Sequence, residues 1–143
     1  MIYYGNSYEA MLKGDVKITS GLGIIDNCII DTHFVKRGRF GRLAQAIIMN
    51  PSYMGIGLGE DTALIIKKGN QAECRGSGMV TIIDGSKIRY TNISFTEEGA
   101  PLCVENLKVH ILASGNGLNL EERKFIPAKK DIKLENVAVV DSL

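Results

Sequence analysis

The chain has 143 residues, which is one domain's worth of sequence and enough to bury a core of its own. Hydrophobic residues make up 45% of the chain and charged residues 23%, and the formal net charge of +1 provides no overall field for nucleic acid or an anionic membrane. No apolar run approaches the roughly 20 residues that cross a bilayer, and the N-terminus lacks the pattern of a signal peptide. We therefore expect a cytoplasmic domain without a nucleic-acid or membrane partner.

A strand followed by a helix is the clearest secondary-structure pattern in the chain. The first 20 residues are poorly patterned, and the apolar run Cys28–Ile30 after them is nearly continuous, which predicts a strand buried on both faces, as in a parallel sheet. Residues 39–50 predict a helix, because apolar residues recur at spacings of three and four and Pro51 disfavours helical geometry at Asn50. The apolar residues of this stripe are Phe40, Leu43, Ala44, Ile47 and Ile48.

The next stretch, Gly55–Thr62, alternates glycine with other residues before a second apolar run. These glycines match neither G-x-G-x-x-G nor G-x-x-x-x-G-K-[ST], so we interpret them as places where backbones turn or approach closely. Beyond residue 67 the pattern changes to short β-like segments, at residues 71–75, 78–84, 87–95 and 106–112. We interpret these segments as antiparallel ribbons appended to an α/β part. The residues from 121 to 143 form a weakly determined tail.

The three cysteines, Cys28, Cys74 and Cys103, lie far apart, are odd in number and lack C-x-x-C spacing. This arrangement favours small buried thiols in a reduced protein over a disulfide or a metal site. The sequence therefore predicts neither a metal nor a cofactor.

Polar side chains gather where the buried strand passes into the helix. Asp31 and His33 are two residues apart and share one face of a strand, and Arg37, Arg39 and Arg42 follow. Planar guanidinium donors suit carboxylates and phosphates, and the positive end of the helix dipole makes this clustering of arginines unfavourable without an anion. The junction therefore predicts an anionic ligand or an acidic partner, at the place where open α/β sheets hold their ligands. A structural histidine and a solvated helix face remain the alternatives.

A carboxylate that orients His33 in a Ser-His-acid arrangement is also present as a candidate. Glu60 fits this role, although it fits a turn equally well. The nucleophile is not recognisable, because no G-x-S-x-G occurs and Ser77, in Arg75-Gly76-Ser77-Gly78, is one residue short of that pattern. The second histidine, His110, is expected on the surface of a strand.

The sequence resembles the C-terminal half of a cyanophycinase over roughly residues 15–120. Cyanophycinases are serine-type exopeptidases with a class I glutamine-amidotransferase-like fold that cut multi-L-arginyl-poly-L-aspartate into β-aspartyl-arginine dipeptides. The resemblance implies an α/β fold, namely the C-terminal half of a flavodoxin-like sheet with appended antiparallel β ribbons. The segments that carry the resemblance are Gly21–Gly23, Ile30–Phe34, Arg37–Leu43, Gly55–Ala63, Gly76–Val80 and Asn106–Leu112.

The resemblance also assigns roles to residues. It implies that His33 is the catalytic base and Glu60 the acid of the triad, with Glu9 as a weaker candidate for the acid. Thr32 stands where the family usually has glutamine, so the substrate contact at this position is a shorter one. The positions that resemble the substrate pocket are Asp31, Thr32, Arg37, Arg39 and Arg42.

The family's Gly-Thr-Ser-Ala-Gly nucleophile elbow has no counterpart in this sequence. The resemblance therefore implies that residues 1–143 form one partial domain, in which residues 1–20 are the link from an N-terminal half that carries the serine. Such a chain exposes a sheet edge and an apolar face, which favours pairing with that half or a homodimer. Two other hypotheses stay open: a non-catalytic module that binds acidic or β-aspartyl peptides, and an unrelated α/β domain that binds phosphate through its arginines.

Overall fold

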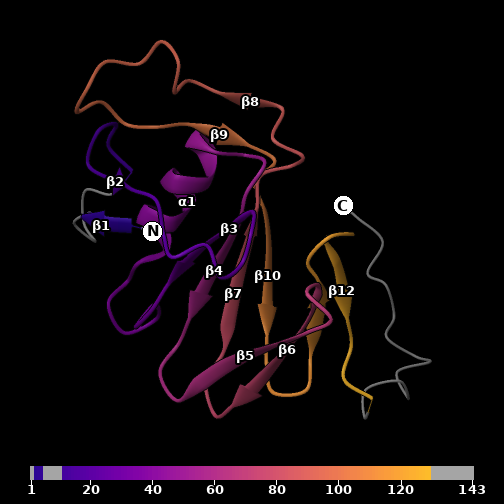
Figure 1. Ribbon diagram of the computed structural model, residues 1–143. Helices are drawn as coiled ribbons and strands as arrows, with labels where there is room; N and C mark the ends of the chain where they lie inside the picture. The colour runs from indigo at the N-terminus through magenta and orange to yellow at the C-terminus, as the bar shows by residue number, and fades with distance from the viewer. Residues whose placement is uncertain (1, 5–10, 130–143) are drawn as a thin grey trace, which may run out of the picture.

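A computed structural model of the protein describes residues 2–4 and 11–129. Within this part of the chain there is one α-helix, α1 (Phe40–Met49), and the remaining regular structure is strand (Figure 1). The strands are β1 (Ile2–Tyr4), β2 (Lys17–Ile18), β3 (Cys28–Asp31), β4 (Met54–Leu58), β5 (Thr62–Lys67), β6 (Gln71–Gly76), β7 (Val80–Asp84), β8 (Tyr90–Thr91), β9 (Val104–Glu105), β10 (Lys108–Leu112), β11 (Gly117–Asn119) and β12 (Lys124–Ile126).

The central sheet has the strand order β10-β7-β4-β3. Strands β3 and β4 are parallel, with Ile30 opposite Ile56, and the other two pairings are antiparallel. The prediction of a strand in a parallel pair is therefore confirmed, and the structure is a mixed α/β fold. The prediction that this strand is buried on both faces is wrong at Ile30, which is 38% exposed. The prediction that residues 78–84 and 106–112 belong to appended ribbons is wrong, because β7 and β10 extend the central sheet. All five residues of β7 are buried, as expected of a strand that is covered on both faces.

A second sheet, of order β12-β11-β6-β5, is antiparallel throughout and packs on the central sheet. The core between the sheets contains Met54, Ile56 and Ile82 from the central sheet and Cys74 and Leu118 from the second. Strand β12 lies within the tail expected from residue 121 onward and pairs with β11, so this part of the tail is regular structure. Of the predicted ribbon segments, β6 and β8 lie in antiparallel pairings outside the central sheet, with β5 and β9 as their respective partners.

Helix α1 covers the other face of the central sheet, where Leu43 and Ile47 pack against Ile29 and Ile83. The predicted range of 39–50 differs from the observed one only at the two capping residues. The predicted stripe is wrong at Phe40, which is 45% exposed. Buried residues at the opposite edge of the helix complete the apolar face instead: Gln45 and Ala46.

The polar side chain of Gln45 is buried, and it forms hydrogen bonds with the backbone of the segment that precedes β3. Its Nε2 donates to the Leu12 carbonyl at 2.8 Å, and its Oε1 accepts from the Val16 amide at 3.2 Å. Periodicity alone does not identify such a residue, since the partner groups come from a distant backbone segment.

Strands β8 and β9 form an arm that lies beyond α1 at the top of Figure 1. Of the predicted strand over residues 87–95, only Tyr90–Thr91 is strand. The Asn92 carbonyl accepts from the Thr96 amide at 3.0 Å, and the Asn92 side chain accepts from the Cys103 amide at 2.7 Å, so the chain turns here.

Of the three thiols, Cys74 is buried, Cys28 is half-buried and Cys103 is exposed, so the expectation of buried thiols fails for Cys103. In the part of the chain that the structure describes, no helix is long and apolar enough to span a membrane.

Gly57 in β4 allows the Phe34 ring to lie against the sheet. A Cβ atom at Gly57 would lie 2.5 Å from Phe34 Cγ, and Phe34 itself is buried. We expect Gly57→Ala to lower the free energy of unfolding by about 1–3 kcal/mol, because the ring must move within a packed core. Urea denaturation measures this change. An unchanged midpoint would show that the ring is free to shift and that Gly57 is not needed for packing.

Candidate active site

The candidate site forms at the carboxyl ends of the parallel strands β3 and β4. His33 follows the end of β3 and Glu60 follows the end of β4, each after one intervening residue. Because β3 and β4 pair in parallel, with Asp31 opposite Gly57, both residues leave the sheet at the same edge. The chain turn that carries His33 is held to β4 by the Phe34 amide, which donates to the Leu58 carbonyl at 3.0 Å.

His33 and Glu60, the two residues predicted to be catalytic, lie next to each other. His33 Nδ1 is 3.7 Å from Glu60 Oε1, which is an ion-pair distance for a protonated imidazole and longer than a hydrogen bond. The His33 side chain is 59% exposed and that of Glu60 is 20% exposed, so the carboxylate sits behind a ring that faces solvent. His33 has a φ of 51°, in the left-handed region, which directs its side chain out of the strand direction.

Asp31 is the centre of a second group of side chains at the same edge. It is 4% exposed and accepts hydrogen bonds from Arg42 Nε at 2.6 Å, from Arg42 Nη2 and from Arg39 Nη1 at 3.3 Å. The backbone amide of the next residue, Thr32, donates to Asp31 at 3.0 Å, and Arg39 Nη1 also donates to the Thr32 carbonyl. We call Asp31, Arg39 and Arg42 the arginine clamp. It joins the end of β3 to the start of α1.

The arginine clamp explains why two arginines are tolerated at the start of a helix. Asp31 of the same chain supplies a carboxylate beside both guanidiniums, and the role of these three residues as substrate contacts stays a prediction. Burial, followed by repulsion from Arg42, lowers the pKa of Arg39, and the charge of Asp31 opposes this effect. The remaining predicted pocket residues, Thr32 and Arg37, are exposed.

The other residues singled out in the sequence lie elsewhere. Ser77 is exposed in the turn after β6, where its amide donates to the Asp61 carbonyl at 3.1 Å. His110 is half-buried rather than at the surface, and its ring centroid lies 5.9 Å from that of Phe125 on β12. Burial, and then the charge of Lys108, lowers the pKa of His110. Glu9, the weaker candidate for the acid, lies outside the described residues.

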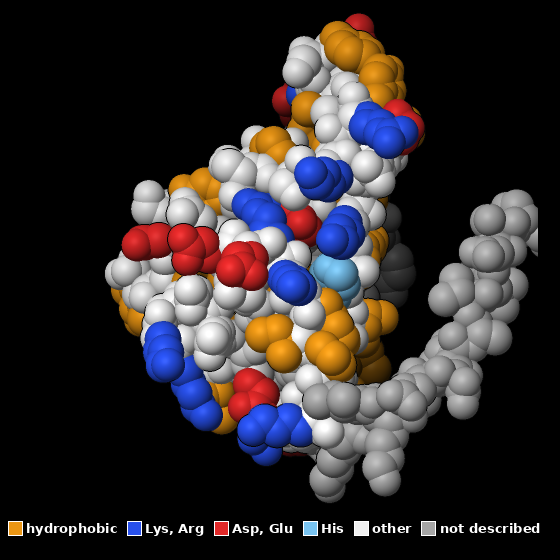
Figure 2. Space-filling model, turned by 90° about the vertical axis from the view of Figure 1, so that its right-hand side faces the viewer, with side chains coloured by type: hydrophobic (Ala, Val, Ile, Leu, Met, Phe, Trp, Pro, Cys, Tyr) orange, Lys and Arg blue, Asp and Glu red, His pale blue; other side chains and the backbone are white. Residues whose placement is uncertain are grey.

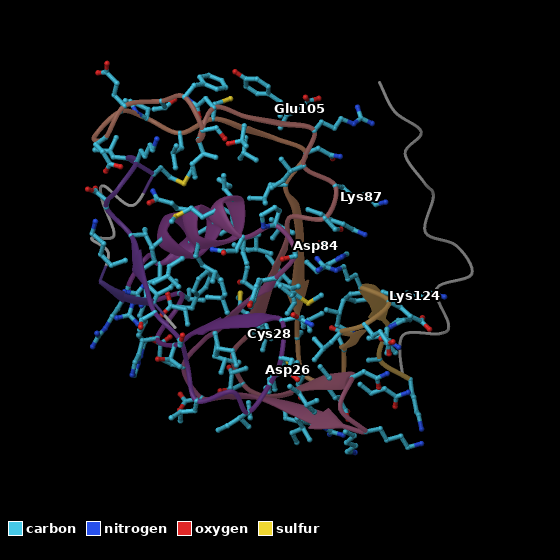
Figure 3. The ribbon with its side chains drawn as sticks, turned by 45° about the horizontal axis from the view of Figure 1, so that its top comes forward. Asp26, Cys28, Asp84, Lys87, Glu105 and Lys124 are labelled. Carbon is cyan, nitrogen blue, oxygen red and sulfur yellow. The ribbon has the colours of Figure 1, made fainter. Side chains whose placement is uncertain are left out.

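Sequence reasoning missed a buried ion pair at the opposite end of the central sheet. Asp84 ends β7, opposite the first residue of β4, and its carboxylate pairs with Arg123 (Asp84 is labelled in Figure 3). Arg123 also donates to the Ser52 carbonyl, and the Ser86 amide donates to Asp84 at 2.9 Å. Arg123 lies in the expected tail, so nothing in the local sequence pointed to this pairing. Figure 2 shows basic and acidic side chains intermixed on one face of the molecule, in keeping with the net charge of +1.

The pairing of Asp84 predicts a pH dependence of stability. Burial tends to raise the pKa of Asp84, but hydrogen bonds from Ser86 and the contact with Arg123 outweigh burial and leave this pKa below its ordinary value. A carboxylate whose pKa is lower in the folded than in the unfolded state adds stability above the unfolded value of about 3.9. That stability is lost as the pH falls through the folded pKa.

We therefore expect Asp84→Asn to lower the free energy of unfolding at pH 7 by about 1.5–3 kcal/mol and to flatten its decline below about pH 4. Urea denaturation, repeated at pH values between 3 and 7 that differ by about one unit, measures both effects. Glu105→Gln, which removes an exposed carboxylate on β9, is the control. Parallel acid declines for Asp84→Asn and the unsubstituted protein would contradict the role of this carboxylate.

Proteins with similar sequences are cyanophycinases. The chain is 38% identical over 128 residues to the cyanophycinase of Trichormus variabilis, an alignment that covers 90% of this chain and 43% of that protein. It is 40% identical over 119 residues to the cyanophycinase of Geminocystis herdmanii, covering 83% of this chain and 44% of that protein. The match to the enzyme of Synechococcus elongatus is 38% over 120 residues, covering 84% and 37%. No family model matches the chain.

The chain therefore spans less than half the length of the curated relatives it matches. This coverage confirms a resemblance to part of a cyanophycinase, and the aligned length includes most of the chain. By sequence, the chain resembles the C-terminal half of a cyanophycinase, and it corresponds to less than half of each of these relatives.

Proposed function

We propose that this chain is the part of a cyanophycinase-type serine peptidase that carries the histidine and the acid of the triad. The proposal includes the fold, as the C-terminal half of a class I glutamine-amidotransferase-like sheet. The observation that carries it is the approach of His33 Nδ1 to Glu60 Oε1, 3.7 Å apart, at the carboxyl ends of two parallel strands. In a Ser-His-acid triad the acid faces one ring nitrogen and the serine the other, so Nε2 of His33 is the nitrogen left for a serine.

In this proposal a serine supplied by another segment attacks the scissile carbonyl, and His33 Nε2 takes the hydroxyl proton. His33 then gives that proton to the leaving amine. Water next attacks the acyl-enzyme, and His33 takes the proton of this water and gives it to the serine as the acyl group is released. Glu60 stabilises the imidazolium that forms in each step. The Glu60–His33 distance is longer than a hydrogen bond, as is common before substrate is bound, and shortens in the reacting complex.

The substrates we propose are multi-L-arginyl-poly-L-aspartate or related β-aspartyl peptides. The arginine clamp engages the Asp31 carboxylate, so Arg37, which is exposed, is the guanidinium most accessible to a substrate carboxylate. The clamp holds two guanidiniums and one carboxylate, and its surplus positive charge attracts an acidic peptide without a direct contact. Thr32, exposed between Asp31 and His33, lies beside the same edge.

The serine-bearing segment has an available edge of the sheet to pair with. Within residues 2–4 and 11–129, β3 pairs with β4 alone, and Ile30 of β3 and the nearby Leu22 and Ile24 are exposed. An unpaired strand with apolar side chains is a site for strand addition. We propose that this edge receives the segment with the serine, with residues 1–20 as the link to it. A homodimer and a cytoplasmic location remain predictions.

The test is release of β-aspartyl-arginine from cyanophycin by the purified chain, alone and mixed with the serine-bearing segment of a relative. We expect product only in the mixture. A matched mixture in which the serine of that segment is replaced by alanine is the control and should give none. If the two segments form a complex that releases no product, the catalytic proposal is wrong. Binding of β-aspartyl peptides to that complex would then favour the non-catalytic module.

A further inference from the structure

The acid of the proposed triad lies on a turn that a separate segment holds in place. This turn, residues 58–62, joins β4 to β5, and residues 76–79 join β6 to β7 beside it. The Gly59 amide donates to the Met79 carbonyl at 3.0 Å, and the Ser77 amide donates to the Asp61 carbonyl at 3.1 Å. Glu60 therefore sits between two backbone hydrogen bonds that fix its neighbours but not Glu60 itself.

Thr62 supplies the contact to Glu60. Its Oγ1 donates to the Glu60 carbonyl at 2.8 Å, across the turn and within a partly buried environment. Gly78 lies directly against this hydrogen bond. A Cβ atom at Gly78 would overlap both Thr62 Oγ1 and the Glu60 carbonyl oxygen, so a glycine is required for the two segments to approach this closely.

The contact matters for the site because the Glu60 backbone determines where its carboxylate lies. Glu60 Oε1 is already 3.7 Å from His33 Nδ1, so a small shift of the turn separates the pair further. The neighbouring Asp61 has a φ of 51°, in the left-handed region, and such a conformation persists only where surrounding contacts hold it. Thr62 itself does not approach the substrate in this arrangement, since its hydroxyl is committed to the backbone of the turn.

We propose that Thr62, seated against Gly78, is a positioning residue for Glu60 and through it for His33. This inference rests on the proposed function for its catalytic consequence, and on the geometry of the turn alone for its structural one. Thr62 acts on the backbone carbonyl of Glu60 rather than on its carboxylate. Its replacement therefore alters the position of the acid without removing the acid.

The chain contains only two histidines, His33 and His110, which makes a direct spectroscopic test practical. The ring carbon–proton signals of the chain are recorded by NMR at a fixed pH, with Glu60→Gln as the reference for loss of the acid. We expect Thr62→Val to shift the His33 signals in the direction that Glu60→Gln shifts them, and Thr62→Ser to restore them. The His110 ring contacts Phe125 of β12, so its signals should stay where they are in all three variants.

Two further variants control for folding. Thr62→Ala removes the hydroxyl without placing a methyl group against the Glu60 carbonyl, so it reports on the same hydrogen bond if Thr62→Val does not fold. Thr91→Val is the matched control, because Thr91 Oγ1 also bonds a backbone group two residues away, the Ile93 amide at 3.3 Å, in the arm of β8 and β9. Thr91→Val should leave the His33 signals unchanged.

The kinetic arm uses the reconstituted mixture with the serine-bearing segment. We expect Thr62→Val and Thr62→Ala to lower kcat on the order of 10- to 100-fold with little change in KM, and Thr62→Ser to retain most activity. If folded Thr62→Val and Thr62→Ala leave the His33 signals in place, the inference is overturned. If the signals move and no mixture releases product, the positioning role stands and the proposed function fails.

Discussion

Asp31→Ala is expected to lower the free energy of unfolding by about 3–5 kcal/mol, because it leaves two guanidiniums largely buried without their carboxylate. The same substitution removes the acceptor of the Thr32 amide and disconnects the end of β3 from the start of α1. Chemical denaturation, followed by far-ultraviolet circular dichroism, measures the change. Asp31→Asn should have a stability between those of the unsubstituted protein and Asp31→Ala, since an amide keeps one acceptor but not the charge.

The control for Asp31 is an exposed ion pair of the same chemical type. Glu73 Oε1 lies 2.6 Å from Arg75 Nη2 on β6, with side chains 30% and 56% exposed. Glu73→Ala should cost less than about 1 kcal/mol, because solvent screens the pair. Equal costs for Asp31→Ala and Glu73→Ala would contradict the structural role of the clamp.

The clamp also separates the roles of the arginines in catalysis. In the reconstituted enzyme, Arg37→Ala is expected to raise KM while leaving the unfolding midpoint unchanged, because Arg37 is exposed. Arg42→Ala is expected to lower the unfolding midpoint, since it leaves the buried Asp31 carboxylate with fewer donors.

His33→Asn in the reconstituted enzyme is expected to lower kcat on the order of 10⁴- to 10⁶-fold, as loss of the base of a serine triad does. Asparagine is the appropriate replacement because His33 has a φ of 51°, a conformation that asparagine adopts more readily than alanine. With the side chain 59% exposed, the unfolding midpoint should hardly move. The assay is release of β-aspartyl-arginine, with the folded state checked by circular dichroism.

The remaining histidine provides the control for this substitution. His110→Gln, on β10, should retain activity, because His110 packs against Phe125 on the opposite side of the central sheet from α1. If His33→Asn is folded and as active as the unsubstituted chain, His33 is not the base. The proposed function then has no candidate for that role in the described part of the chain.

Local pattern was sufficient to find the elements that build the site. The apolar run at Cys28–Ile30 predicted a strand and the spacing of apolar residues predicted α1, because both patterns follow from side-chain direction. The run did not predict that Ile30 is exposed, since burial depends on what packs against the strand. The same pattern was insufficient for β7 and β10. Short apolar segments separated by turns fit either a ribbon or a central sheet, and the pairing of β7 with β4 and of β10 with β7 decided between them.

The sequence by itself determined the resemblance to part of a cyanophycinase, the junction of β3 with α1 and the identities of the residues gathered there, because these depend on residue type and spacing along one segment. Only the tertiary structure decided how they are partnered. It brought Glu60 to His33 through the parallel pairing of β3 and β4, and it brought Arg123, between β11 and β12 of the second sheet, to Asp84 in the central sheet. It also directed Arg39 and Arg42 onto Asp31. Ion pairs form between side chains that folding makes neighbours, and spacing along the chain does not specify which of several nearby anions a guanidinium will meet.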